Sequence, residues 1–350
     1  MPTEVIIITP EATPGAGGVA DYTLRVVSEW GDVCRLRFLV PNSVGDGTEE
    51  LGQNAAALLN NLPTKGGRVL LQYSGYGFNK INYPRWLLRA LADWKRKSGG
   101  LLVVMLHEIW TFWPWWNKNY FVQLFHRRGL GKLVRSADVT FTSTAFHAEQ
   151  LRRLAPAKQI EVLPVGSNIR PQNSHGAKTL GAAVLFGLQG SRVRTLRRLR
   201  PELKSLAAAQ RIRKLVTAGG RNFHDADERD LLTGLQLVDG FEQHGALPEE
   251  AISELLSHAS FGVSAQEAVS VTKSGAFMAY AAHGLNIISP FASPAEEPPL
   301  RWGTHPDELL QGISDEELSE RGEKLRDWQE HACSWPHIAE RFASALQLGN

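Results

Sequence analysis

Short apolar runs alternate with segments of helical spacing along most of the chain, and this alternation restricts the fold more than any other feature. Val5–Thr9 is the first such run, and it reads as a parallel strand that is covered on both faces. A glycine loop follows at residues 10–19, and residues 20–30 then carry apolar side chains at helical spacing. Strand, glycine loop and helix in this order form the first turn of a doubly wound α/β domain.

The same unit recurs to the end of the chain. Further strands are expected at Arg35–Val40, Arg68–Tyr73, Leu101–Leu106, Ala137–Thr142, Ile160–Pro164, Ala182–Phe186, Lys214–Ala218, Leu235–Val238, Phe261–Val263 and Leu285–Ile288. Ser167–Lys178, which is rich in turn-forming residues, is the predicted linker. A length of 350 residues favours two domains. We therefore expect two Rossmann-like α/β domains, at 1–170 and 171–334, with a terminal helix at 335–350.

Composition narrows the class of protein. Apolar residues make up 43% and charged residues 21% of the chain, as in soluble globular proteins. A formal charge of +2 argues against a dedicated nucleic-acid binder. The separation of Cys34 and Cys333 in the sequence matches no metal-binding or redox motif, so two reduced thiols are expected. Without a signal-peptide pattern or an apolar run of about 20 residues, we expect a cytoplasmic protein.

Ser264–Pro290 carries the strongest binding signal. Thr272, Lys273, Ser274 and Gly275 fall where a buried helix should begin. A helix start offers free backbone N–H groups and a positive dipole end, and here a hydroxyl and an ammonium group stand beside them. This segment is predicted to hold the diphosphate of an activated sugar. Alternatively, Lys273 is a solvated loop lysine.

Two glycine loops supply further candidates for the donor site. Arg192 and Arg194 follow the loop at residues 187–190 and provide more positive charge. Gly17 and Gly18 would let a ligand approach the backbone closely, although the loop also fits a plain tight turn. The glycine spacing differs from the dinucleotide fingerprint, so no nicotinamide cofactor is expected.

His107 and Glu108 stand at the carboxyl end of a predicted strand, where ligands of open α/β sheets collect. His107 is therefore a candidate site residue, although a structural histidine would also fit. The aromatic stretch Ile109–Phe121 follows directly, and it suits sugar stacking or the interfacial zone of an anionic membrane. The basic residues Arg127, Arg128, Lys132 and Arg135 come after it. Alternatively, the aromatic stretch and the basic segment form a packed corner between two helices, with the charges in solvent and no binding role.

Several motifs together resemble the glycosyltransferase family 4 enzymes. The matching segments are Gly17–Tyr22 (GGVADY), His107-Glu108, Ala137–Ser143 (ADVTFTS), Glu161–Ile169 (EVLPVGSNI), Leu185–Arg192 (LFGLQGSR), Ala281–Pro290 and Ser334-Trp335. Each is weak alone, but their order and spacing cover nearly the whole chain. The resemblance implies the GT-B fold, with two Rossmann-like domains facing across a cleft and a last helix packed back on the first domain.

The resemblance also implies an activity and site roles. It implies transfer of a sugar from a nucleotide-diphosphate donor to a glycan or lipid-linked acceptor, with retention and without an obligatory metal or a cofactor. His107 would contact the transferred sugar. The expected acceptor-side residues are Asp21, Tyr22, Glu108 and Trp110. Peripheral contact with an anionic membrane face remains a separate hypothesis.

One departure from the family pattern concerns its glutamate pair. Val271 and Ala279 occupy the two positions, so the usual ribose contact is missing, and Glu267 is the nearest substitute. The loss leaves two alternatives open, a non-catalytic GT-B subunit of a glycan assembly complex and a sugar-nucleotide epimerase. Asp225-Ala226-Asp227 fits a metal-binding D-x-D pattern, but acidic residues at a helix start explain it better.

Overall fold

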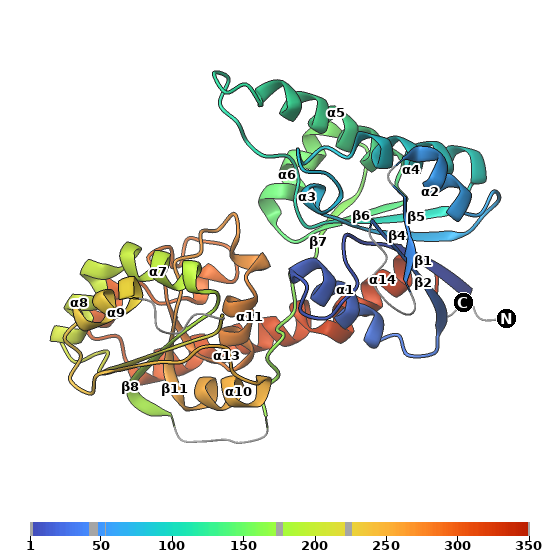
Figure 1. Ribbon diagram of the computed structural model, residues 1–350. Helices are drawn as coiled ribbons and strands as arrows, with labels where there is room; N and C mark the ends of the chain where they lie inside the picture. Colours follow the sequence, from blue (N-terminus) through green and yellow to red (C-terminus); the bar gives the residue numbers. More distant parts are fainter. Residues whose placement is uncertain (1–2, 42–47, 53, 173–177, 221–225, 349–350) are drawn as a thin grey trace. The chain divides into compact units, whose positions relative to one another are not determined.

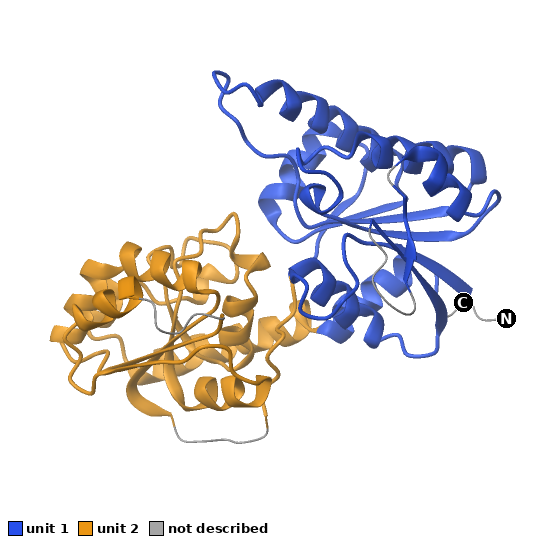
Figure 2. Ribbon diagram, viewed as in Figure 1, with its two compact units in different colours: residues 1–164, 335–350 blue, residues 165–334 orange. Residues whose placement is uncertain are grey.

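A computed structural model describes residues 3–41, 48–52, 54–172, 178–220 and 226–348 (Figure 1). The chain divides into two compact units, unit 1 with residues 1–164 and 335–350 and unit 2 with residues 165–334 (Figure 2). The division after Pro164 lies six residues before the boundary that the sequence indicated. Helix α14 (Trp335–Ala345) belongs to unit 1 although unit 2 separates it from the rest of that unit in the sequence.

Unit 1 is built on a parallel sheet of seven strands in the order β3-β2-β1-β4-β5-β6-β7. The strands are β1 (Thr3–Ile8), β2 (Cys34–Val40), β3 (Thr48–Glu50), β4 (Arg68–Tyr73), β5 (Leu101–Leu106), β6 (Val139–Thr142) and β7 (Ile160–Val162). The helices are α1 (Gly18–Ser28), α2 (Ala55–Asn61), α3 (Gly75–Phe78), α4 (Arg85–Ser98), α5 (Tyr120–Ser136), α6 (Ala145–Leu154) and α14. The chain order reverses between β1 and β4, which makes this the switch point where such sheets bind ligands.

Both faces of this sheet are covered, which explains why its strands are continuous apolar runs. Val5 to Ile8 of β1 are completely or almost completely buried. Figure 1 shows α4 and α5 on one face of the sheet and α1 and α14 on the other. Trp30 Nε1 donates to the Ala339 carbonyl at 3.0 Å, and this bond ties α14 to the end of α1.

Unit 2 repeats the design with a parallel sheet of five strands in the order β10-β9-β8-β11-β12. The strands are β8 (Thr179–Phe186), β9 (Lys214–Ala218), β10 (Phe241–Gln243), β11 (Ala259–Val263) and β12 (Asn286–Ile288). The helices are α7 (Gln189–Arg198), α8 (Arg200–Ala208), α9 (Ala226–Thr233), α10 (Glu249–His258), α11 (Gly275–Ala282), α12 (Pro306–Gln311), α13 (Asp315–Cys333) and the 3-10 turns η1 (Val271–Lys273) and η2 (Leu300–Trp302). Its switch point lies between β8 and β11.

The predicted strand at Leu235–Val238 is wrong. Leu235 N bonds back to the Leu232 carbonyl, and Gln236 has a φ of 56°, so this segment turns at the end of α9. The strand β10 begins only at Phe241, after Gly240. The two-domain Rossmann-like architecture that the sequence predicted is confirmed.

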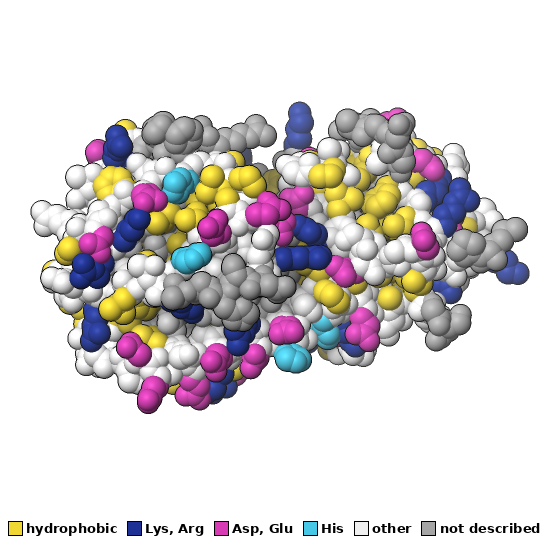
Figure 3. Space-filling model, turned by 90° about the horizontal axis from the view of Figure 1, so that it is seen from below, with side chains coloured by type: hydrophobic (Ala, Val, Ile, Leu, Met, Phe, Trp, Pro, Cys, Tyr) yellow, Lys and Arg dark blue, Asp and Glu magenta, His cyan; other side chains and the backbone are white. Residues whose placement is uncertain are grey.

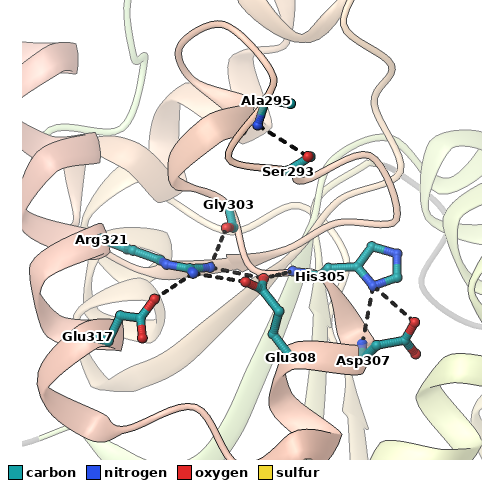
Figure 4. Close-up of polar contacts among 8 residues, drawn as sticks. All are labelled: Ser293, Ala295, Gly303, His305, Asp307, Glu308, Glu317 and Arg321. Carbon is teal, nitrogen blue, oxygen red and sulfur yellow. Dashed lines mark hydrogen bonds and ion pairs between the residues drawn. The ribbon is translucent and has the colours of Figure 1, made fainter.

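An ion cluster fixes the segment after β12 (Figure 4). Arg321 of α13 binds Glu308 of α12 through two hydrogen bonds of 2.8 and 2.9 Å. The same guanidinium donates to Glu317 at 2.6 Å and to the Gly303 carbonyl at 3.0 Å. Hydrogen bonding to Arg321 lowers the pKa of Glu308, so this carboxyl stays ionised. The cluster therefore joins two helices to the loop that leads from β12.

Charged side chains of both signs are interspersed over most of the face drawn in Figure 3. Within the described ranges, no helix has the length and apolar character needed to cross a membrane. Cys34 and Cys333 are free thiols, and both are buried.

Candidate functional site

Two glycine turns meet at the carboxyl ends of β8 and β9 in unit 2. Gly187 and Gly219 have φ values of 136° and 99°, which favour glycine. A Cβ at Gly219 would lie 2.8 Å from the Gly187 carbonyl oxygen, so these turns pack too closely for a larger residue. Gly190, in the first turn of α7, has no other group within 4 Å of a Cβ position. Ligand atoms can therefore approach this backbone closely.

The N-terminus of α11 lies against the first of these turns. A Cβ at Gly187 would stand 3.8 Å from the Cβ of Ala276. Ser274 caps the helix, because its hydroxyl accepts from Phe277 N at 3.3 Å. Gly275 is exposed, and Lys273 on η1 is half-buried. Ser274, Gly275 and Lys273 thus stand at the carboxyl edge of the sheet, beside the switch point.

Buried contacts hold α11 in this place. The Tyr280 hydroxyl accepts a 2.6 Å hydrogen bond from Phe186 N at the end of β8. The Tyr280 ring lies over Gly262 of β11, where a Cβ would come within 2.6 Å of the ring. Burial raises the pKa of Tyr280 well above its usual range. The Thr272 carbonyl also accepts from Val165 N at 3.0 Å, which fixes η1.

Arg192 does not occupy the position that a phosphate contact requires. Its side chain is 1% exposed and binds Glu228 of α9 at 2.7 and 2.8 Å. Its Nη1 donates to the Gly187 carbonyl at 2.7 Å and also to the Gly219 carbonyl. We therefore correct its role, because this guanidinium joins the two glycine turns instead of facing a ligand. Arg194, on the exposed side of α7, remains a predicted donor contact.

Glu267, the remaining predicted site residue of unit 2, lies in the turn before η1. Glu267 is exposed, and its carbonyl accepts from Ser270 N and Val271 N. Its carboxylate is therefore open to solvent at the start of this turn. Val271 and Ala279 are 2% and 0% exposed and pack within an apolar core.

In unit 1 the loops after β1 and β4 meet at the switch point. A Cβ at Gly77 would lie 2.4 Å from Pro10, which shows how closely these loops pack. The Asp21 carboxylate accepts from Gly15 N at 2.8 Å and so supports the glycine loop. Gly17 is extended, whereas Gly18 is exposed with nothing within 4 Å of a Cβ position. At Gly18, ligand atoms can therefore approach the backbone of the first turn of α1 closely.

His107 follows β5 and is half-buried at the same edge of the sheet. Its Nε2 lies 2.8 Å from Gln72 Oε1, and because an amide oxygen only accepts, Nε2 carries the proton. The ring packs edge-on against Tyr22 at 4.8 Å. Among the described residues, the Tyr22 hydroxyl and Gln72 Nε2 are buried without hydrogen-bond partners. Glu108 beside them is exposed.

The positions of Tyr22 and Trp110 do not fit the predicted acceptor contacts. Tyr22 is 3% exposed, because Trp335 and Phe342 of α14 cover its ring at 5.3 and 6.3 Å. Trp110 is 2% exposed, and the Arg127 guanidinium lies 5.2 Å from its ring centre. Both rings are core in this structure, so neither offers a face for sugar stacking.

Sequence reasoning missed Gln72 and Tyr280. Gln72 is the polar residue inside the apolar run VLLQY, and such an interruption near a strand end could have been noticed. Tyr280 gave no signal, because an aromatic residue in a buried helix is expected from packing alone. Of the D-x-D segment, Asp225 lies outside the described residues, and Asp227 pairs with Arg197 at 2.9 Å. The described residues hold no group of three possible metal ligands.

Both units have the architecture of GT-B proteins, and the chain has this fold. A glycosyltransferase from Rickettsia africae matches with a TM-score of 0.64 and 12% identity, over 99% of this chain and 98% of that one. WaaG, a glycosyltransferase involved in lipopolysaccharide biosynthesis, matches with a TM-score of 0.60 and 14% identity, over 99% and 100%. A putative UDP-N-acetylglucosamine 2-epimerase from Listeria monocytogenes matches with a TM-score of 0.53 and 13% identity, over 99% and 96%. Neither a protein-family model nor a curated protein sequence matches the chain.

Proposed function

We propose that this protein is a glycosyltransferase that moves a sugar from a nucleotide-diphosphate donor to a hydroxyl of a glycan or lipid-linked acceptor. The observation that carries the proposal is the α11 N-terminus at the switch point of unit 2. Lys273, Ser274 and Gly275 stand there beside the Gly187 turn. Backbone N–H groups at a helix start, a hydroxyl and an ammonium group complement a diphosphate.

The chemistry assigns these groups a role in the bond-breaking step. When the bond between the anomeric carbon and the phosphate oxygen breaks, negative charge develops on the leaving diphosphate. The Lys273 ammonium and the first amides of α11 would stabilise that charge where it develops. Arg194 is a further proposed contact, and Glu267 is proposed to accept from the ribose hydroxyls.

In unit 1, His107 is the proposed catalytic contact to the transferred sugar. Gln72 fixes its protonated Nε2, so the ring is held in one orientation. Gly17 and Gly18 would admit the donor to the backbone, and Asp21 and Glu108 remain proposed acceptor-side groups. Retention of anomeric configuration and activity without a metal belong to the same proposal. Product stereochemistry by NMR and activity after treatment with a chelator test these two points.

The decisive experiment measures binding before activity. Nucleoside diphosphates and nucleotide sugars are titrated calorimetrically into the wild-type protein, Lys273→Ala and the control Lys324→Ala. Lys324 lies on α13 and pairs with Glu320 at 2.6 Å, away from the α11 start in the sequence. Loss of a charge-assisted hydrogen bond predicts about tenfold to 100-fold weaker binding for Lys273→Ala alone. Equal affinity of all three proteins would remove Lys273 from the mechanism.

A second candidate function rests on Val271 and Ala279. Both side chains are buried among apolar residues, at the two positions where the resembling family carries glutamates. The absence of these two carboxylates is the basis for the alternative, a non-catalytic GT-B subunit that binds a carbohydrate or a protein partner. Binding of a nucleotide sugar followed by nucleotide release would exclude this function. Absence of binding for every nucleotide sugar would support it.

A further inference from the structure

Helix α5 carries an exposed stripe with two chemically distinct halves. Phe121, Leu124 and Phe125 are exposed in its first turns, and the exposed residues of the later turns include Arg128, Lys132 and Arg135. Leu124 and Phe125 are adjacent and the other steps are three or four residues, so at 3.6 residues per turn all six positions fall on one face of the helix. At 1.5 Å per residue the stripe is about 21 Å long. We call these six residues the α5 stripe.

The loop before α5 extends the apolar half of the stripe. Trp115 and Trp116 are 76% and 72% exposed, and their rings meet edge to face at 5.7 Å. Phe112 in the same loop is 51% exposed. Figure 1 shows this loop projecting beyond the start of α5 within unit 1. Large rings on a projecting loop are not explained by the packing of the core.

The basic half of the stripe continues into a groove between α4 and α5. The groove has a volume of about 610 Å³, and its lining includes Arg85, Arg89, Arg128 and Lys132. None of these four forms an ion pair with a carboxylate in the part of the chain that the structure describes. The acidic residue of the lining, Asp93, already pairs with Arg96 at 2.8 Å. The groove therefore presents uncompensated positive charge.

We propose that the α5 stripe, the Trp115-Trp116 loop and the α4–α5 groove form a docking surface for an anionic lipid bilayer. Tryptophan and phenylalanine rings are stable at the boundary between headgroups and acyl chains. Arginine and lysine side chains at the adjacent level bind lipid phosphates and respond to the negative surface potential. Along α5 the exposed apolar side chains come first and the basic side chains follow. A bilayer surface has the same order, with the acyl-chain boundary beneath the layer of lipid phosphates.

Single-stranded nucleic acid is the competing occupant, because it also binds basic and aromatic residues. Stacking platforms place aromatic side chains along the basic groove, so that bases and phosphates are bound together. Of the exposed rings, Phe125 lines the groove beside the cations, whereas Phe112, Trp115, Trp116 and Phe121 lie outside its lining, in the loop and at the start of α5. This separation favours the bilayer. The inference does not depend on the proposed enzymatic function.

The test is sedimentation of the full-length protein with vesicles at low salt. Pure phosphatidylcholine vesicles are compared with vesicles that also contain phosphatidylglycerol. We expect binding to the anionic vesicles only, with release at high salt. Arg128→Gln together with Lys132→Gln should weaken partitioning about 25-fold, since each basic residue near the surface contributes about fivefold. Trp115→Ser together with Trp116→Ser should weaken it about tenfold or more.

The matched control removes two cations with the same spacing from another exposed helix face. Arg200→Gln together with Lys204→Gln on α8 changes the net charge equally and should leave partitioning unchanged. Circular dichroism verifies that every variant is folded. The inference would be overturned if the wild-type protein did not bind anionic vesicles, or if the control lost as much partitioning as the Arg128/Lys132 variant. Binding to single-stranded DNA in place of vesicles would also overturn it. Nucleotide binding is measured separately, so a negative vesicle result leaves the proposed function intact.

Discussion

The guanidinium of Arg192 and the carboxylate of Glu228 form a buried bidentate ion pair inside unit 2. Nε donates to Oε1 at 2.7 Å and Nη2 donates to Oε2 at 2.8 Å, with side chains 1% and 0% exposed. The third nitrogen, Nη1, binds the carbonyls of Gly187 and Gly219. One buried side chain thus connects α7, α9 and both glycine turns, so the pair positions the candidate site without facing it.

Glu228→Gln should destabilise unit 2 by about 3–5 kcal/mol, because it leaves the Arg192 charge buried without a counter-charge. Urea unfolding monitored by circular dichroism measures the change. Asp227→Asn is the matched control, since the neighbouring acid on α9 pairs with Arg197 of α7 at the surface. That exposed pair contributes at most about 1 kcal/mol. Equal effects of the two variants would contradict a structural role for the buried pair.

Arg192 also shows where sequence reasoning reaches its limit. The glycine loop with a basic residue after β8 was recognisable, and the loop does lie at the edge of the sheet. The direction of the Arg192 side chain could not be recognised from the sequence, because it depends on Glu228, 36 residues away. A distant carboxylate that completes a buried pair leaves no local pattern.

Tyr280→Phe should cost about 1–3 kcal/mol of unfolding free energy, because it leaves Phe186 N without its buried acceptor. Since this bond joins α11 to the end of β8, nucleotide affinity should fall as well if the proposed function is correct. Thermal unfolding and calorimetric titration measure the two effects. Tyr76→Phe is the control, because its hydroxyl is in an exposed residue and lies 3.2 Å from Thr111 Oγ1. A Tyr280→Phe protein as stable as the control would show that the bond is dispensable.

Acid should destabilise unit 1 through His126. Burial lowers the pKa of His126 from 6.5 to about 4, and the ring bonds to the Tyr73 hydroxyl at 2.6 Å. Below pH 6.5 the unfolded chain takes up a proton that the folded protein resists, so stability falls as pH drops toward 4. The difference between the unfolded and folded pKa values corresponds to a loss of about 3 kcal/mol of unfolding free energy across this pH range.

The measurement compares unfolding free energies of wild type and His126→Gln between pH 7 and pH 4. The variant should lose less stability, since glutamine does not titrate. His283 contributes a slope of the same sign in both proteins, because burial lowers its pKa too. Parallel pH profiles for the two proteins would contradict the assignment to His126.

The sequence predicted the strands and the two sheets well because both depend on local periodicity. Continuous apolar runs such as Val5–Ile8 must be buried on both faces, and the structure buries them. Burial of single aromatic residues is a different matter. Trp110 and Trp115 belong to one aromatic stretch, yet one is 2% and the other 76% exposed. Trp110 packs in the apolar core of unit 1 with Arg127 5.2 Å from its ring centre, whereas Trp115 lies in the exposed loop, and periodicity describes neither placement.

The last prediction concerns α14, which is far from the rest of unit 1 in the sequence. Phe342 is completely buried and packs edge to face on Phe141 of β6 at 4.9 Å and on Tyr22 of α1 at 6.3 Å. Phe342→Ala should therefore cost about 3–5 kcal/mol through lost burial and a residual cavity. Phe121→Ala removes the same atoms from a side chain that is 66% exposed, and it should change stability by at most about 0.5 kcal/mol. Urea unfolding of both variants measures the difference. If Phe342→Ala were as stable as Phe121→Ala, α14 would contribute no core to unit 1, and the aromatic contacts that cover Tyr22 would not explain its burial.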